Sequence, residues 1–192
     1  MRKFIGLIAL VTCLLLLVPR GALAYLADVA GHWSNALLTA LEARGVIAGD
    51  RAGNFYPDDL LTRAELARIL VTGLGYSEDA ARVQDAPSRF VDVSRDHPDR
   101  GYIELLWELG LAQGYPDGRF GPEEPVTRAE MAVVLVRAAG LEQRATVLRT
   151  ARLAYRDAAQ IPGWAVGAVA AAVEAGLMTG DDMGWYRPAD PV

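Results

Sequence analysis

The chain has 192 residues, with 19 basic and 24 acidic side chains and a formal net charge of −5 at pH 7. An acidic chain argues against sequence-independent nucleic-acid binding, which needs a clustered basic surface. The length suits one medium-sized domain or a few small units.

The first 24 residues have the three parts of a secretory signal peptide. Met1–Lys3 is positively charged, residues 4–18 are almost wholly apolar, and Ala22–Ala24 has the small-x-small pattern of a cleavage site. The apolar run is short for a membrane span, so we expect cleavage before Tyr25 and no membrane association afterwards. Cleavage leaves 16 arginines against 24 acids, a net charge of −8. It also removes Cys13, the only cysteine, so we expect no disulfide and no thiolate metal site.

The rest of the chain repeats itself at intervals of 64 to 66 residues. The recurring landmarks are an aspartate, two glycines and a proline: Asp28, Asp92 and Asp157; Gly45, Gly110 and Gly176; Gly49, Gly114 and Gly180; Pro57, Pro122 and Pro188. A fixed interval of this kind is typical of repeat proteins. We therefore expect repeats at 25–75, 90–140 and 155–192, joined by partly helical linkers at 76–89 and 141–154.

The pattern within each repeat predicts helix, turn and helix, and therefore an all-α fold. Apolar residues at helical spacing lead to Gly45, Gly110 or Gly176, each suited to the left-handed conformation that ends a helix. A glycine-rich turn follows. Its middle copy, residues 114–120, contains Pro-Asp-Gly and ends at Phe120, which we expect to anchor the turn in the core.

The second helix begins with Thr-Arg-Ala-Glu in two of the repeats. Threonine at the N-cap and glutamate three residues later form a capping box, so we expect structural roles for Thr62, Glu65, Thr127 and Glu130. The third repeat keeps Pro188, but the chain ends one residue before the position where the threonine is due. We therefore expect a truncated third repeat without its second helix, and either marginal stability or self-association that completes it.

These features resemble the S-layer homology family over residues 25–192. The second repeat resembles it most, with Phe90-Val91-Asp92-Val93, a GYPDGRF turn at 114–120 and the Thr-Arg-Ala-Glu string at Thr127. The resemblance implies a pseudo-threefold bundle of repeats. The grooves between them would bind an anionic, often pyruvylated, secondary cell-wall polysaccharide or a peptidoglycan-linked polymer. Such binding would hold a secreted protein non-covalently at the bacterial cell surface, as in an S-layer.

Two arginines are the first candidates for ligand contact. Arg63 and Arg128 follow the capping threonines, where a cation opposes the helix dipole. Beside free N–H groups a guanidinium would bind a carboxylate well. We therefore expect both to contact the ligand; an intramolecular ion pair is the alternative.

The repeated aspartates and two tryptophans are further candidates. Asp28, Asp92 and Asp157 could cap the next helix or hydrogen-bond to sugar hydroxyls. Trp33 and Trp164 could stack on a sugar ring or fill the core. Pro98 stands at the matching position of the second repeat, which favours core packing for both.

Catalysis has little support in the sequence. His32 and His97 are the only histidines, and neither belongs to a metal-binding or triad pattern. We expect no catalytic residue, metal or cofactor. Two alternatives to a wall-binding module stay open: the N-terminal anchor portion of a larger surface enzyme, such as a polysaccharide hydrolase, and a helical scaffold that binds protein.

Overall fold

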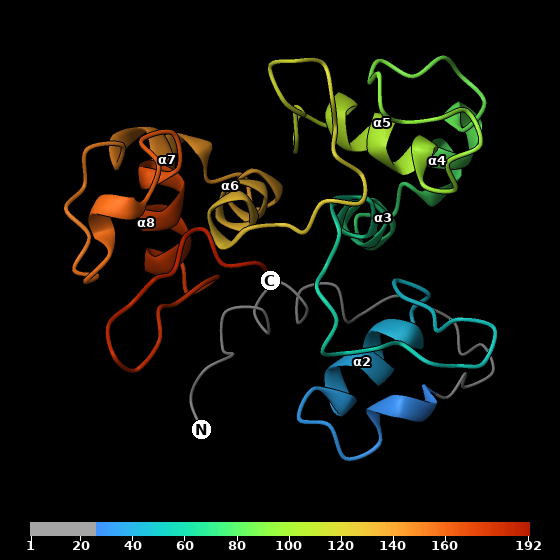
Figure 1. The fold of residues 1–192 in the computed structure, drawn as a ribbon, viewed down its shortest axis with the longest axis horizontal. Coiled ribbons are helices and arrows are strands. Elements are labelled where there is room, and N and C mark those ends of the chain that lie inside the picture. The colour runs from blue at the N-terminus through green and yellow to red at the C-terminus, as the bar shows by residue number, and fades with distance from the viewer. Residues whose placement is uncertain (1–25) are drawn as a thin grey trace.

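The computed structural model describes residues 26–192, and the expected signal peptide with Cys13 lies outside them. The helices of this part are α2 (Asn35–Glu42), α3 (Arg63–Gly73), α4 (Ser77–Val83), α5 (Arg100–Glu108), α6 (Arg128–Ala138), α7 (Glu142–Val147) and α8 (Val166–Glu174), with short 3₁₀ turns at Ala27–Val29 and Ala158–Gln160. The described residues form no sheet, which confirms the all-α prediction (Figure 1). Within them, no helix combines the length and apolar character needed to cross a membrane.

The first helix of each repeat ends as the sequence predicts. The glycines after α2, α5 and α8 all have positive φ: 68° at Gly45, 72° at Gly110 and 69° at Gly176. The amide of Leu111, one residue later, donates back to the carbonyl of Leu106 at 3.0 Å, which closes a Schellman motif. The apolar pair that follows each glycine is thereby turned back onto its own helix.

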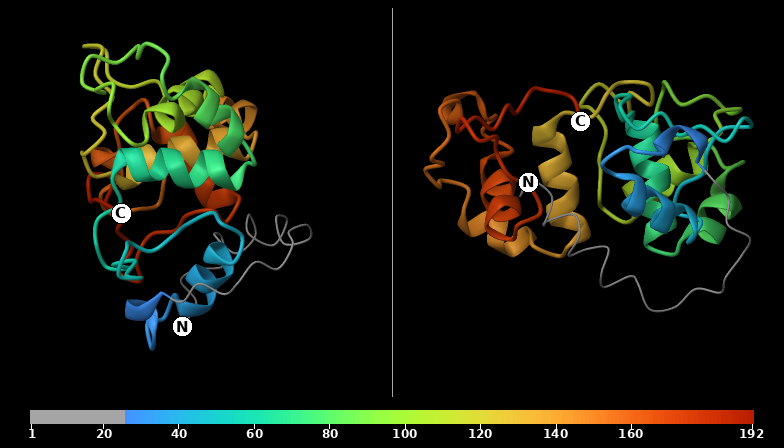
Figure 2. Two further views of the ribbon diagram at one scale, coloured as in Figure 1. Left: turned by 90° about the vertical axis from the view of Figure 1, so that its right-hand side faces the viewer. Right: turned by 90° about the horizontal axis from the view of Figure 1, so that it is seen from below.

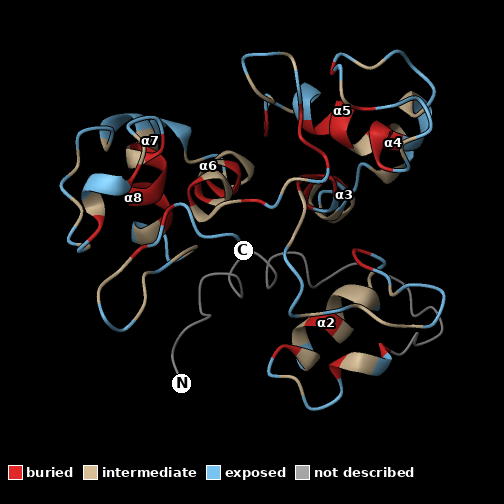
Figure 3. Cartoon of the chain, viewed as in Figure 1, coloured by how far each residue is buried: buried red, intermediate tan, exposed pale blue. Residues whose placement is uncertain are grey.

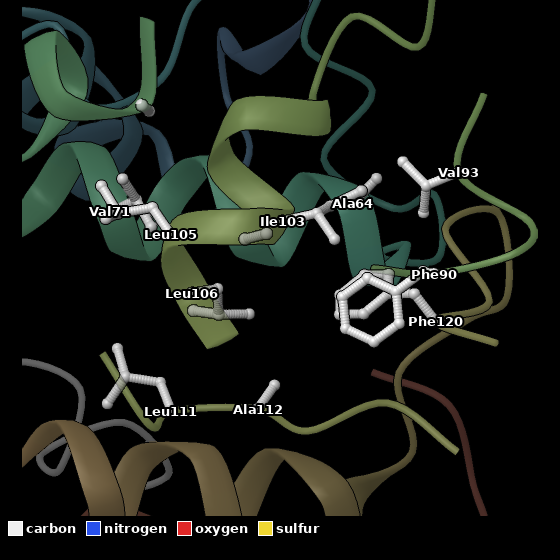
Figure 4. Close-up of a cluster of buried hydrophobic side chains, with 12 residues drawn as sticks. Ala64, Val71, Phe90, Val93, Ile103, Leu105, Leu106, Leu111, Ala112 and Phe120 are labelled. Carbon is white, nitrogen blue, oxygen red and sulfur yellow. The ribbon is translucent and has the colours of Figure 1, made fainter. Parts of the chain in front are cut away.

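In the second and third repeats the aromatic residue at the end of the turn anchors it in the core, as predicted for Phe120. Phe120 is 1% exposed and its ring centroid lies 5.2 Å from that of Phe90 (Figure 4). Tyr186 is fully buried and pairs in the same way with Tyr155, at 5.3 Å. The turns are therefore part of the hydrophobic core.

The helices exchange partners between repeats. The second helix of the first repeat, α3, packs against α5, and the second helix of the second repeat, α6, packs against α8. The segments expected as linkers, 76–89 and 141–154, contain α4 and α7, which pack on α5 and α8. We call α3, α4 and α5 the middle lobe, and α6, α7 and α8 the last lobe (Figures 1 and 2).

The helix α2 stands outside these two lobes. Its surroundings form a smaller cluster with Leu26, Leu38 and Ile47 at the centre and Ile69 of α3 at its edge. Leu38 is the only buried residue of α2, whereas six residues are buried in α5 and six in α8 (Figure 3). The helix α8 is the last helix of the described residues.

A ring of backbone hydrogen bonds joins the three repeats. Leu61 donates to the carbonyl of Val192 at 2.8 Å, Val126 to that of Leu61 at 2.9 Å, and Val192 to that of Val126 at 2.9 Å. These three residues occupy the same position in their repeats, and the C-terminus lies between the lobes and α2 (Figure 1). The ring supports the pseudo-threefold arrangement, which stays a prediction.

Candidate functional site

The starts of α3 and α6 hold the capping boxes at the junctions between repeats. Thr62 Oγ1 accepts from the amide of Glu65 at 3.2 Å, and Glu65 Oε2 accepts from the amide of Thr62 at 2.9 Å. Thr127 and Glu130 repeat this geometry at 3.3 and 2.9 Å. Both glutamates are thus fixed in place by local bonds.

The expectation of free amide groups at these helix starts is wrong. The amide of Arg63 donates to the carbonyl of Glu124 at 3.0 Å, and that of Ala64 to Pro122 at 3.0 Å. In α6, the amides of Arg128 and Ala129 donate in the same way to Asp190 and Pro188. The amide groups that were expected to hold an anion therefore donate to carbonyl oxygens in the loop of the following repeat, because the repeats interlock there.

Arg63 is buried in the junction between the first two repeats and is only 9% exposed. Its Nε donates to the carbonyl of Phe120 at 2.7 Å, and its Nη1 pairs with Glu130 Oε1 at 2.8 Å. The guanidinium carbon also lies 4.8 Å from the ring centroid of Tyr115. This is the intramolecular ion pair that the sequence left open as an alternative.

Arg128 is bound similarly but has no acidic partner. Its Nε donates to the carbonyl of Tyr186 at 2.8 Å and its Nη2 to that of Thr179 at 2.6 Å. Among residues 26–192, no carboxylate forms an ion pair with it, and its side chain is half-buried. Arg63 and Arg128 therefore hold equivalent places with different charge environments.

The three repeated aspartates fasten the turns, and none of them caps a helix. Asp92 accepts from the amides of Phe120 at 2.8 Å and Gly121 at 2.7 Å. Asp28 and Asp157 bind the equivalent amides of their own repeats. Desolvation raises the pKa of Asp28, but the bonds from these amides outweigh it and hold that pKa below its usual range.

Both candidate tryptophans lie at the surface, so the preference for core packing is wrong. Trp33 is 66% exposed and Trp164 is 63% exposed. In this part of the chain Ile161 and Ala165 are the residues buried in the core, not Trp164. An exposed aromatic face can stack on a flat apolar surface of a ligand, whereas a core residue cannot.

A groove of about 450 Å³ lies between the second and third repeats, and we call it the repeat 2–3 groove. Its walls are Tyr115, Glu124, Pro125, Thr127, Ala129 and Glu130 on one side and Gln160, Pro162, Trp164, Pro188 and Ala189 on the other. A second hollow of about 380 Å³ adjoins it at Gln160 and Pro188 and contains Trp185 and Arg187. The site thus combines aromatic and proline surfaces with a few polar groups, as ligand sites do.

The carboxylates of the groove are held by hydrogen bonds. The hydroxyl of Tyr115 donates to Glu124 Oε2 at 2.8 Å, and Arg119 Nη1 donates to Glu124 Oε1 at 2.9 Å. These two bonds keep the pKa of Glu124 below its usual range. Burial and the bond to Glu124 raise the pKa of Tyr115 to about 12. Glu124 is therefore ionised and Tyr115 neutral at physiological pH.

Three polar residues of the groove were not predicted as site residues from the sequence: Tyr115, Glu124 and Gln160. Tyr115 belongs to the GYPDG string, which was interpreted only as a turn, so the tyrosine itself was the available signal. Glu124 follows the turn and precedes the helix start at Thr127, where an acidic residue is common and does not by itself indicate a site. Gln160 has no signal in the sequence, because its place in the groove depends on how two repeats meet.

In the first two repeats a histidine that precedes the first helix lies beside an acid in the loop after the turn. His97 Nδ1 accepts from the amide of Asp99 at 3.1 Å, so its proton lies on Nε2, which is 3.2 Å from Glu123. His32 Nε2 lies at the same distance from Asp58. Residues 26–192 contain no group of His, Cys, Asp and Glu that could hold a metal ion.

A helical repeat protein with an aromatic and acidic groove between its repeats is a binding module in its general design. The S-layer homology domain matches residues 26–67, 89–132 and 154–192. The chain therefore belongs to the S-layer homology family, as its sequence motifs predicted. Membership places it at the cell surface, in the cell wall.

Three proteins similar to this chain show the kinds of protein in which related sequences occur. The chain is 32% identical over 158 residues to an endoglucanase of Bacillus sp. (strain KSM-635), which covers 81% of this chain and 16% of the relative. It is 34% identical over 102 residues to the surface layer protein of Brevibacillus choshinensis, covering 53% and 9%. It is 38% identical over 88 residues to the cellulosome-anchoring protein of Acetivibrio thermocellus, covering 46% and 20%. The chain spans a fifth or less of each relative.

Proposed function

We propose that this chain anchors a protein to the bacterial cell wall by binding an anionic secondary cell-wall polysaccharide in the repeat 2–3 groove. The observation that carries the proposal is Trp164, a 63% exposed indole in the wall of a groove that also holds two fixed carboxylates. An aromatic face offers a platform for the apolar side of a sugar ring. Glu124, Glu130 and Gln160 supply hydrogen-bond acceptors for its hydroxyl groups.

The anionic group of the polymer is assigned to Arg128. This arginine has no ion-pair partner among the described residues, and although it does not itself line the groove, its neighbours Thr127 and Ala129 do. A guanidinium without a carboxylate partner suits a carboxylate ligand such as a pyruvate ketal. The proposal therefore gives ligand contact to Trp164 and Arg128.

The other candidate residues take supporting roles in the proposal. Arg63 holds Glu130 in position through their 2.8 Å ion pair. Asp28, Asp92 and Asp157 fix the turns, and the capping residues fix the helix starts. Trp33 is exposed like Trp164 but lies outside the walls of the repeat 2–3 groove. It is a candidate for ligand contact at the equivalent place of the first repeat.

The relatives support an anchoring role of either of two kinds. The cellulosome-anchoring and surface layer proteins favour a module that binds the wall. The endoglucanase and a cell wall amidase of Bacillus anthracis favour the second candidate, an anchor that belongs to a surface enzyme. In both cases residues 26–192 supply the anchor, and enzymatic activity would come from other domains.

Co-sedimentation of residues 25–192 with purified cell-wall sacculi tests the proposal. We expect binding that falls when pyruvate is removed from the polymer, when soluble pyruvylated sugar is added, and in the Arg128→Ala variant. Arg149→Ala is the matched control, because Arg149 is exposed and, unlike Arg128, has no sequence neighbour in the walls of the groove. Binding that persists through all three changes would refute the assigned chemistry and favour a scaffold that binds protein.

A further inference from the structure

The helices α4 and α7 occupy the same place in their two lobes. The helix α4 packs on α5 and α7 packs on α8. The carbonyl oxygen of Ala80 lies against Gly101, just as that of Ala145 lies against Gly167. This contact makes residue 145 the equivalent of residue 80, so the segment 142–153 is equivalent to the segment 77–88. The outer surfaces of the two segments can therefore be compared position by position.

These equivalent segments carry opposite charge. Residues 77–88 contain three acids and one arginine, a net charge of −2, whereas residues 142–153 contain one acid and three arginines, a net charge of +2. At one position the sign is directly reversed, with Asp79 in α4 and Arg144 in α7. We call the surface of residues 77–88 the acidic face and that of residues 142–153 the basic face. A chain that is acidic overall thus has one basic surface.

Two arginines of the basic face are available to a partner. Arg149 and Arg152 are exposed, and within residues 26–192 neither forms an ion pair. Arg144 differs from them, because it binds Glu174 Oε2 of its own lobe at 2.7 Å. Val147 lies between these arginines in the chain and is 70% exposed. An exposed apolar residue beside unpaired cations has the composition of a docking surface with an apolar centre and a polar rim.

The acidic face offers complementary groups. Glu78 and Asp79 share a single cation, Arg82, at 3.5 and 2.5 Å, which leaves one negative charge in excess. Asp85 is exposed, and it forms no ion pair within the described part of the chain. Tyr76, at the start of α4, is 40% exposed and supplies an apolar surface close to these acids in the chain. The acidic face therefore matches the basic face in charge and also has an apolar element.

The two faces lie at opposite ends of the molecule. In Figure 1, α4 lies beyond α3 on the right and α7 lies beyond α6 on the left, and Figure 2 shows the same separation from below. One molecule therefore cannot bring its own two faces together, but two copies can. We infer that the basic face of one copy docks on the acidic face of a second copy. Such a head-to-tail contact produces a chain or a ring of copies. It needs no wall polymer and does not depend on the proposed function.

Sedimentation velocity of residues 25–192 in the absence of polymer tests the inference. We expect concentration-dependent association that is lost as added salt shortens the Debye length from about 10 Å to about 3 Å. Arg149→Glu with Arg152→Glu reverses the basic face, and Glu78→Arg with Asp79→Arg reverses the acidic face. Each double variant alone should associate roughly tenfold more weakly. A mixture of the two should recover association, because the acidic face of the first then meets the basic face of the second.

The matched control is Arg51→Glu with Arg95→Glu, which changes the net charge equally at two exposed arginines outside both faces. It should associate like the parent chain. Both face variants should still bind wall sacculi, because neither face lines the repeat 2–3 groove. The inference is wrong if the parent chain stays monomeric at low salt, if the control weakens association equally, or if the mixture does not recover it. Loss of sacculus binding on reversal of the basic face alone would assign that face to an anionic polymer instead.

Discussion

Arg63 shows how a cation can stand at a helix start, where the dipole disfavours it. The guanidinium leaves the start of α3 and crosses to the next repeat, where it meets Glu130, the carbonyl of Phe120 and the ring of Tyr115. Charge-assisted hydrogen bonds in a buried place exceed the cost of an unfavourable dipole, which is at most about 1 kcal/mol at an exposed helix end. The residue therefore joins two repeats.

Arg63→Ala should destabilise the chain more than Arg128→Ala. The first change leaves Glu130 without its cation in a half-buried place and should lower the free energy of unfolding by about 3 kcal/mol. Arg128→Ala removes two hydrogen bonds to carbonyl oxygens and leaves no carboxylate unpaired. We therefore expect its free energy of unfolding to fall by only about 1–2 kcal/mol. Urea unfolding followed by tryptophan fluorescence measures both, and equal losses would contradict the role given to the ion pair.

Glu104 makes stability depend on acid pH. This buried carboxylate accepts from Arg89 Nε at 2.6 Å and from Ser88 Oγ at 2.7 Å. Burial alone would raise its pKa, but these bonds hold the pKa below its ordinary value of 4.5. The folded state thus binds the proton less readily than the unfolded one. The stabilisation is complete above pH 4.5 and is lost as the pH falls through the folded-state pKa.

The variant Glu104→Gln should flatten this acid dependence. We expect its free energy of unfolding to be lower than that of the parent at pH 7 and to change less between pH 7 and about pH 3. Glu108→Gln is the control, because Glu108 lies 3.5 Å from Arg89 Nη2 but is 47% exposed. If the two variants show the same pH profile, Glu104 is not the responsible group.

The roles of single residues were predictable where their partners are close in sequence. Thr62 and Glu65 are three residues apart, so the capping box could be read directly from the string. Asp92 binds amides 28 and 29 residues away, and Arg63 pairs with a residue 67 positions away. No local pattern names partners at such distances. The sequence therefore left the aspartates open between capping a helix and binding sugar hydroxyls, and it favoured ligand contact for the arginine.

At the scale of elements, close helix contacts depend on two glycines. A Cβ atom added at Gly101 of α5 would collide with the carbonyl oxygen of Ala80 in α4. Gly167 of α8 has the same relation to Ala145 in α7. The backbones approach so closely that only glycine fits. These contacts make α4 and α7 parts of the lobes, although the sequence was read as linkers there.

Gly101→Ala should therefore separate α4 from α5. We expect a loss of about 1–3 kcal/mol in the free energy of unfolding, because the backbone must shift to admit the methyl group. The equivalent position of α2 is Ala36, which is exposed, and Ala36→Gly should cost only the helix propensity of about 1 kcal/mol. Faster amide exchange confined to α4 and α5 would locate the damage. An unchanged stability in Gly101→Ala would contradict the close packing.

Helix existence and helix ends were readable from the sequence, but helix partners were not. The glycines at 45, 110 and 176 and the Thr-Arg-Ala-Glu strings set the ends by local backbone chemistry. An amphipathic pattern shows that a helix has an apolar face without naming what covers it. The exchange that packs α3 on α5 and α6 on α8 follows from the whole chain.

At the scale of the molecule, interlocking repeats create the groove. The helix start of one repeat is held by the loop of the next, so residues from two repeats line one surface. The sequence predicted that a groove would lie between repeats through the family resemblance. It could not show that Trp164, Tyr115 and Glu124 meet there, because their positions are set by the junction.

The central claim is that the repeat 2–3 groove holds the wall polymer against Trp164. Its most direct test is titration of purified wall polysaccharide into residues 25–192, compared with the Trp164→Ala and Trp33→Ala variants. The two tryptophans are almost equally exposed, but only Trp164 lines the groove. We predict that Trp164→Ala weakens binding about tenfold, equivalent to about 1.4 kcal/mol, while Trp33→Ala has a much smaller effect. Unchanged affinity in Trp164→Ala would contradict the account.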